Sequence, residues 1–338
     1  MIPSLPRPRW LRAATALYLL AFFAFLFLPL IVVAVFAFND APYPAPPWHG
    51  FTLDWFLGNP RSGRVGLFAD SALLGSIWTS CVVAAWVTVL SLLVGVSNAF
   101  LIERRNFRGK QALSVLMLAP LVIPGVILGI SILAFASRIA DVVSDAWGLD
   151  WEFLRPGLPL VVMGQFSYIA TIATLTISAR LRRFDRTLEE AASNLGAGKA
   201  AVLRTIVLPY LRPALIGSAA ISFLMSFADF NTTLMLVGAD APLTVEMYGR
   251  MREGATPVLN AVSLFLMVAS ALLALGLMRR GPRRPPHRPR PLEATAGPAV
   301  ALRPPGTARP RPLRCPSPAA RTSPCGRVPP GSSAISRP

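Results

Sequence analysis

The chain contains few charged residues for its length. Of its 338 residues only 14% are Asp, Glu, Lys or Arg, whereas 54% are hydrophobic, and the mean hydropathy is +0.54. A soluble domain carries about a quarter charged residues, which cover its surface. The composition therefore excludes an ordinary soluble globular protein and indicates a membrane protein.

Histidine and cysteine are also scarce. The two histidines are His49 and His287, so histidine-based catalysis and histidine-ligated metals are not expected. Cys81 lies in an apolar run, and Cys315 and Cys325 lie near the end of the chain, with no spacing of a disulfide framework or metal site. We therefore expect no catalytic residue, no metal and no cofactor in this chain.

Positive charge is plentiful but concentrated at one end. The formal net charge is +17, and residues 279–338 hold 13 arginines against one acid, together with 16 of the 33 prolines. Such a segment buries too little apolar surface to fold, so we predict a disordered basic tail. It is solvated, bound to anionic lipid or an artefact of the reading frame. The charge is therefore not a sign of nucleic-acid binding by the whole chain.

Six apolar runs are long enough to cross a bilayer as helices, which takes about 20 residues. They occupy residues 13–38, 71–102, 112–137, 158–179, 213–237 and 258–278. We therefore predict an all-α membrane protein with six transmembrane helices over residues 13–278, preceded by an N-terminal segment (1–12). The first run is too long for the core of a signal peptide, so we interpret it as a retained helix.

Lysine and arginine are unequally divided between the two ends of these runs. If the N-terminus is inside, the inner segments hold 27 Lys and Arg and the outer loops hold six. Because positive residues accumulate on the cytoplasmic side, we predict that both termini are cytoplasmic. The predicted outer loops are 39–70, 138–157 and 238–257. They contain tryptophans near span ends, where an aromatic belt is expected: Trp48, Trp55, Trp147 and Trp151.

The third run contains two prolines four residues apart, Pro120 and Pro124, followed by Gly125 and Gly129. Membrane helices tolerate such residues, which is one interpretation. The other is a helix broken beside a cavity. In either case we expect at least a kink.

The inner loop of residues 180–212 is long and has a helical pattern of its own. Its apolar residues recur at helical spacing, namely Leu188, Ala191, Ala192 and Leu195. Thr187 and Glu190 have the spacing of a capping box, and Gly196 stands where a glycine would end the helix. A second short helix, 199–207, would end before Pro209. The two short helices either lie at the interface among lipid headgroups or form a docking element for a soluble partner.

The same loop resembles a known family. Glu190, Ala191, Ala192 and Gly196, followed by Ile206, Leu208 and Pro209, match the "EAA…G…I-LP" signature of permease subunits of binding-protein-dependent ABC importers of type I. The likeness extends over about residues 30–278. The segments 50–55 and 118–124 resemble the spermidine/putrescine-type permeases in particular.

The resemblance implies an importer half. A second homologous permease subunit would complete the pathway, two ABC ATPase subunits would bind inside, and an extracytoplasmic binding protein would deliver the substrate. The seven signature residues would form the loop that couples the permease to the ATPase. No phosphate-binding G-x-x-x-x-G-K-[ST] sequence occurs, so ATP hydrolysis is expected on a separate chain. The expected location is the bacterial inner membrane, with lipid but no nucleic acid as further partner.

Asp229 is the only ionisable residue inside a predicted span, and Asn231 follows closely. At about 1.5 Å per residue it would lie about 24 Å from Pro213 along a continuous helix. A charge there is expected to face a wet cavity or a partner helix. Asp229 is therefore either a hydrogen-bonded helix contact or a cation-attracting group on the translocation pathway. The resembled permeases often have two acids here, whereas this chain has Ala228 in place of the first.

Polyamines are thus the expected cargo. The alternative is an importer of the same class for another small solute, such as ferric iron or phosphonate. An ion-coupled secondary carrier is a remote alternative, because carriers usually contain several intramembrane ionisable residues and inverted repeats.

Overall fold

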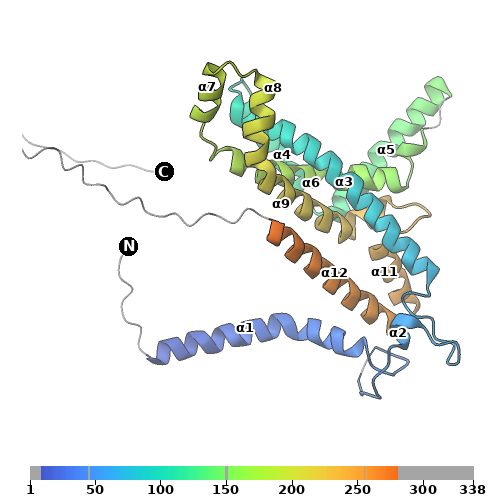
Figure 1. Ribbon diagram of the computed structural model, residues 1–338. Helices are drawn as coiled ribbons and strands as arrows, with labels where there is room; N and C mark the ends of the chain where they lie inside the picture. The colour runs from blue at the N-terminus through green and yellow to red at the C-terminus, as the bar shows by residue number, and fades with distance from the viewer. Residues whose placement is uncertain (1–8, 45, 149–150, 255, 281–338) are drawn as a thin grey trace, which may run out of the picture. The chain divides into compact units, whose positions relative to one another are not determined.

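The computed structural model describes residues 9–44, 46–148, 151–254 and 256–280 (Figure 1). The regular elements of these residues are all helical, apart from two isolated β-bridges. The all-α prediction is therefore confirmed for this part of the chain. The basic tail lies outside the described residues from position 281 onward, and the prediction for it stays untested.

Five helical stretches are long and apolar enough to cross a membrane. They are α1 (Arg9–Phe36), α3 (Ser71–Arg104), α5 (Gly125–Trp147), α6 (Leu158–Leu181) and the continuous stretch Lys199–Phe227. The first, second and fourth predicted runs therefore form the expected helices. The sixth run forms α12 (Val258–Arg280), within which the apolar stretch Val258–Leu273 is described. A sixth span remains a prediction.

The centre of the fold is formed by α3, α6 and α9 (Leu208–Phe227), which pack along one another (Figure 1). Their contact faces consist largely of small residues, which let membrane helices approach closely. Gly95 of α3 shows how close this is, because a Cβ added there would lie 2.9 Å from the Ala173 Cβ of α6. In contrast, α1 has no buried residue.

The third run is not one helix. It forms α4 (Lys110–Val122) and α5, separated at Ile123 and Pro124, which both have extended ψ angles near 130°. Pro124 lacks an N–H and disfavours helical geometry in the residue before it, so the prolyl ring accounts for the break. Of the two interpretations of the run 112–137, the broken helix is therefore the correct one, and α5 runs ten residues beyond the predicted run into the predicted outer loop 138–157.

The fifth run is displaced and broken as well. A helix runs from Lys199 through α8 (Lys199–Val202) and a π-helical turn (η2, Leu203–Val207) directly into α9. The predicted stop before Pro209 is wrong, because the wider π turn accommodates the missing N–H and the ring of that proline. At its other end α9 stops at Phe227, and α10 (Asn231–Leu236) follows a non-helical segment.

The connections also contain short helices that the sequence did not predict. They are α2 (Asp54–Leu57), η1 (Glu152–Leu154) and α11 (Leu243–Glu253). Trp55 of α2 is buried, and its indole N–H donates to the Asn39 carbonyl at 2.8 Å. Its assignment to an aromatic belt is therefore wrong, whereas the other three tryptophans of the predicted belt are exposed.

Candidate functional site

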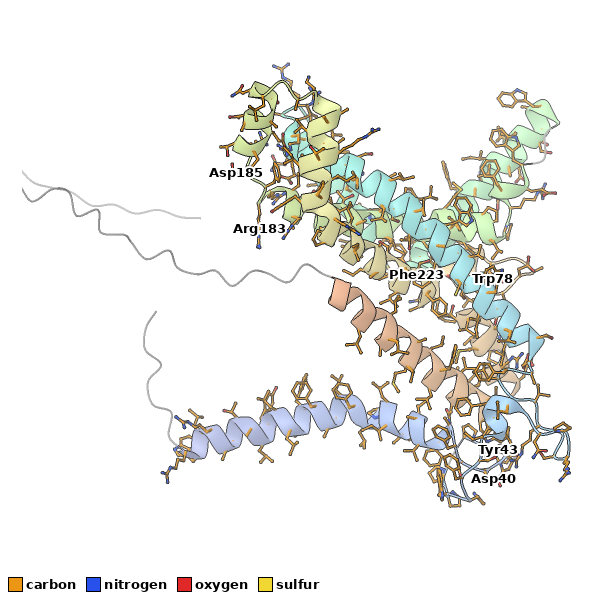
Figure 2. All side chains as sticks on the ribbon, viewed as in Figure 1. Asp40, Tyr43, Trp78, Arg183, Asp185 and Phe223 are labelled. Atoms are coloured by element: carbon orange, nitrogen blue, oxygen red, sulfur yellow. The ribbon has the colours of Figure 1, made fainter. Side chains whose placement is uncertain are left out.

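The first candidate element is the short helix α7 (Thr187–Asn194) in the 180–212 segment. It begins after Arg186, and no side chain of the predicted capping box caps it. Instead, the Asp185 carboxylate accepts a hydrogen bond from the Thr187 backbone N–H at 3.0 Å, which lowers the pKa of Asp185. Asp185 lies on the segment leading into α7 (Figure 2). The helix was thus predicted correctly, but not its capping residue.

The end of α7 is the glycine stop that the sequence predicts. Gly196 has a φ of +85°, a left-handed conformation that favours glycine. Its N–H donates to the Ser193 carbonyl, and the Ala197 N–H donates to the Ala192 carbonyl, both at 3.0 Å. This pair of bonds is the Schellman motif, which satisfies carbonyls that the helix leaves free. A Cβ added to Gly196 would meet no atom within 4 Å, so the space beside it is open in this chain.

The apolar face of α7 is largely uncovered. The side chains of Leu188 and Leu195 are 52% and 89% exposed, and Ala191 is exposed as well. Only Ala192 is half-buried. Glu190 is exposed and forms no ion pair with the described part of the chain. The face predicted to be apolar therefore exists, and this chain does not bury it.

The other signature residues lie on the continuous helix that follows. Ile206 is half-buried in the π turn and packs against a buried cluster, whereas Leu208 and Pro209 at the start of α9 are exposed. The cluster joins the end of α6 to α8 and α9 through Leu181, Phe184, Val202, Val207 and Leu211. The structure thus brings α7 and the start of α9 together on one small core.

The second candidate element is the pair of helix breaks. Gly125 begins α5 and Asn231 begins α10, and a Cβ added to Gly125 would lie 3.1 Å from the Asn231 Cβ. One turn further on, a Cβ on Gly129 would lie 2.8 Å from the Met235 Cβ. The two glycines therefore let α10 lie directly against α5, so the two breaks are neighbours in space.

The sequence predicts Asp229 within a helix, but in the structure it lies in the second break. Its carboxylate accepts hydrogen bonds from the Thr233 N–H at 3.0 Å and from the Thr233 hydroxyl at 2.9 Å, so it caps the start of α10. The Tyr168 hydroxyl lies beside the same carboxylate. Asp229 is half-buried and Asn231 is exposed. Of the two predicted pathway residues, Asn231 thus has the more exposed side chain.

A buried residue that sequence reasoning missed connects the break to the core. Gln165 of α6 is 1% exposed, and its amide donates to the Thr233 hydroxyl at 2.8 Å. Its carbonyl accepts a hydrogen bond from the Ser226 hydroxyl of α9. Four polar groups thus form a chain across α6, α9 and α10 that ends at Asp229. The signal in the sequence was a lone glutamine within the fourth apolar run.

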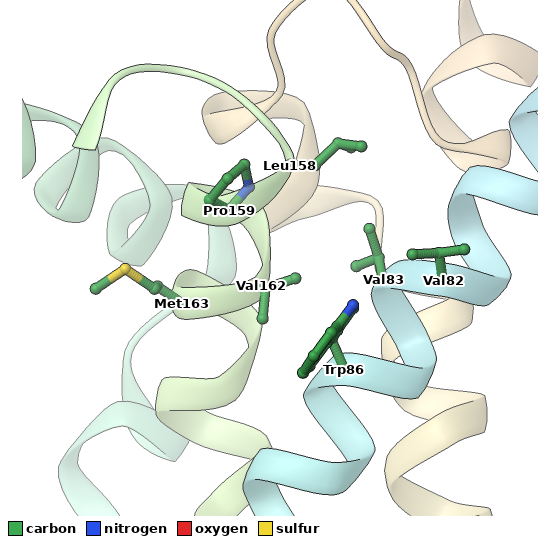
Figure 3. A pocket seen from close by; sticks show the side chains of 7 residues that line it. All are labelled: Val82, Val83, Trp86, Leu158, Pro159, Val162 and Met163. Atoms are coloured by element: carbon green, nitrogen blue, oxygen red, sulfur yellow. The ribbon is translucent and has the colours of Figure 1, made fainter. Parts of the chain in front are cut away.

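The described residues also form apolar pockets. A pocket of about 360 Å³ lies between α3 and α6, with Trp86 of α3 facing Val162 of α6 (Figure 3). A pocket of about 720 Å³ is lined by residues of α3, α9, α11 and α12. Neither is lined by a charged residue, and the described residues contain no cluster of metal-ligating side chains.

Long apolar helices with breaks beside one another, together with an uncovered short helix in a connecting segment, are typical of a transport protein of the membrane. The comparison with protein families agrees. The chain belongs to the family described as "Binding-protein-dependent transport system inner membrane component", whose model matches residues 88–280. The chain is therefore a multi-pass, non-catalytic permease subunit of an ABC importer, and the family assignment argues against a secondary carrier.

Curated relatives and solved structures are similar to the chain. The spermidine/putrescine transport system permease protein PotC of Haemophilus influenzae is 27% identical, over 76% of this chain and 92% of the relative. The putrescine permease PotI of Escherichia coli is 28% identical, over 75% and 86%. The molybdenum permease ModB of Mycobacterium bovis is 29% identical, over 83% and 98%. A bacterial ABC transporter for alginate import matches with a TM-score of 0.61 at 18% identity, over 80% and 94% of the two chains.

Proposed function

We propose that this chain forms half of the translocation pathway of an ATP-driven importer for polyamines. The two relatives with polyamine permease names support this cargo. The match to a molybdenum permease supports a different one, so molybdate replaces ferric iron and phosphonate as the alternative to test. In this proposal the chain has six spans with both termini in the cytoplasm.

The proposed partners follow from the family and from α7. They are a second homologous permease, two ABC ATPase subunits and an extracytoplasmic binding protein. A structure of the similar alginate transporter contains a periplasmic protein bound to an alginate pentasaccharide. Membrane lipid surrounds the spans, and nucleic acid is not a partner.

The uncovered face of α7 is the observation that carries the proposal. Glu190, Ala191 and Gly196 are exposed on a short helix that is fixed at its end by the Schellman motif. We propose that the ATPase covers this face, and that the rigid link through Ile206, Leu208 and Pro209 carries its movement into α9. Small residues suit such a contact because they let another surface approach closely.

Two proposed pathway residues lie at the helix breaks. Asn231 is exposed where α5 and α10 begin, and Asp229 supplies the negative charge beside it. Broken helices at such positions form substrate sites in other transporters. A carboxylate also suits a polyamine cation.

Substitutions at Gly196 test the coupling role. Gly196→Trp places a large side chain in space that is open in this chain, so the side chain itself meets only a partner, while the positive φ strains the backbone as it would for any residue with a Cβ. We expect it to abolish putrescine uptake by cells while the protein remains inserted, and we expect the same of Glu190→Lys. Gly196→Ala is the matched control, because alanine carries the backbone strain of the positive φ but adds only a small side chain.

The measurement uses a strain that lacks this chain and is complemented with each variant. It compares the uptake of radiolabelled putrescine with the uptake of molybdate. Wild-type uptake by both the Gly196→Trp and Glu190→Lys variants would contradict the coupling role. Rescue of molybdate uptake without rescue of putrescine uptake would overturn the cargo but leave the importer class unchanged.

A further inference from the structure

The end of α3 is fastened to the segment that contains α7. The Arg104 guanidinium forms an ion pair with the Glu189 carboxylate in the first turn of α7, and it lies 5.4 Å from the centre of the Phe184 ring. The adjacent Glu103 carboxylate accepts a hydrogen bond from Arg182 Nε at 2.7 Å. The last two residues of α3 therefore hold the chain both before and within α7.

The pair of Arg104 and Glu189 is the better shielded of these contacts. Their side chains are only 18% and 28% exposed, whereas the Arg182 side chain is 67% exposed. Ion pairs in contact with bulk water contribute little, but a shielded pair is costly to break because one charge is left without a partner. Arg104 and Glu189 thus make a firm joint between α3 and α7.

The opposite end of α3 is joined to α11. The Asp70 carboxylate precedes α3 and accepts a hydrogen bond from Arg250 at 2.6 Å, and the Ser80 hydroxyl accepts one from the Leu243 N–H at 2.8 Å. The Thr244 hydroxyl in turn donates to the Asp229 carbonyl at 2.9 Å. With 34 residues, α3 is about 51 Å long. Figure 1 shows its two ends beside α7 and α11.

From this arrangement we propose that α3 is a second transmission element of the importer, and that Arg104 and Glu189 are the positioning residues that engage it. The proposal rests on the proposed contact of α7 with an ATPase. A displacement of α7 reaches α9 through its chain connection. The ion pair is its direct polar contact with α3, next to the cluster against which Phe100 of α3 and Ala192 of α7 both pack. Because α3 is a continuous helix, the displacement is carried to α11 and to the break at Asp229. Coupling of this kind requires a contiguous path of packed or bonded groups, which α3 supplies.

A charge-swap cycle tests the proposal in the complete importer, purified with its partner subunits and reconstituted in proteoliposomes. Arg104→Glu and Glu189→Arg each place like charges together. We expect each single variant to lose about tenfold in putrescine uptake, a size typical of coupling between sites, while the loaded binding protein still stimulates ATP hydrolysis. The double variant restores the opposite charges, and we expect uptake within about twofold of wild type.

Two results would overturn the proposal. One is wild-type uptake by both single variants. The other is a double variant that assembles but transports no better than the poorer single variant. Stoichiometric co-purification of the ATPase subunits reports assembly. If a charge reversal prevents assembly, Arg104→Gln and Glu189→Gln are used instead. We expect the same loss of uptake per ATP hydrolysed for these two variants.

Arg183→Glu is the matched control, because Arg183 is an exposed arginine on the same segment and forms no ion pair with the described residues (Figure 2). We expect wild-type uptake for it. Gly196→Trp in the same assay separates the two hypotheses. If both it and Glu190→Lys transport normally, the ATPase contact is wrong. If it is inactive while Arg104→Glu transports normally, only the role of α3 is wrong.

Discussion

At the scale of single residues, Asp229 combines a structural role with a proposed functional one. Its carboxylate caps α10 through Thr233, and its negative charge lies beside the exposed Asn231. Asp229→Asn keeps an oxygen that accepts these hydrogen bonds but removes the charge. We therefore expect the Asn variant to retain the thermal stability of the purified complex and to lose putrescine uptake.

Asp229→Ala removes both roles. It leaves the buried Thr233 N–H and hydroxyl without their acceptor, which costs about 1–3 kcal/mol in the free energy of unfolding. We expect a lower melting temperature as well as lost uptake. If the Asn variant transports putrescine at the wild-type rate, Asp229 is a helix cap only.

At the scale of elements, the ion pair of Asp70 with Arg250 connects the start of α3 to α11. The hydrogen bond from Arg250 lowers the pKa of Asp70 below its usual 3.8. A lowered carboxyl pKa stabilises the folded state above the ordinary pKa, and this contribution is lost as the pH falls through the lowered value. We expect amide hydrogen exchange in α11 to be slow and constant above about pH 5 and to become less protected below about pH 4, after correction for the intrinsic rate.

Asp70→Asn isolates the charge, because asparagine still caps helices and Asp70 accepts the Leu73 N–H at 3.0 Å. The variant is expected to be about 1 kcal/mol less protected at neutral pH, since the pair is partly exposed, and to lose the acid-dependent change. An unchanged acid response in the variant would mean that another group is responsible.

The elements also show what the sequence could and could not predict. Apolar run length placed α3 and α6 within two residues of their ends, and Pro124 marked the break before α5. The break after Phe227 contains no proline or glycine, so the local sequence does not indicate it. Contacts distant in sequence maintain this break, such as the hydrogen bond from the Thr244 hydroxyl to the Asp229 carbonyl. The ion pair between Arg104 and Glu189 joins residues 85 positions apart, so the sequence could not predict it either.

The cap of α7 is not the one that the sequence predicts. Thr187 and Glu190 have the right spacing, but Asp185 takes the role because its carboxylate reaches the Thr187 N–H. The predicted helix end before Pro209 is wrong for a different reason, because a π turn lets the helix continue through this proline. Local patterns thus predicted that α7 exists and where it ends, but not which residue caps it or that the helix continues through Pro209.

At the scale of the whole molecule, the proposal requires α7 and the 39–70 loop to lie on opposite sides of the membrane. Each carries an exposed serine, Ser193 on α7 and Ser62 on the loop. In a chain whose three cysteines are replaced by serine, Ser62→Cys and Ser193→Cys provide single labelling sites for a membrane-impermeant maleimide. Cells with a permeabilised outer membrane expose only the extracytoplasmic side to this reagent.

We expect Ser62→Cys to be labelled in such cells and Ser193→Cys only after the inner membrane is opened. The physical reason is the excess of Lys and Arg in the segments assigned to the inside. The cysteine-free parent is the control for background, and putrescine uptake verifies that each variant is assembled. Labelling of Ser193→Cys before the inner membrane is opened would place α7 outside, where no ATPase is available to cover it, and the importer mechanism proposed for this helix would be wrong.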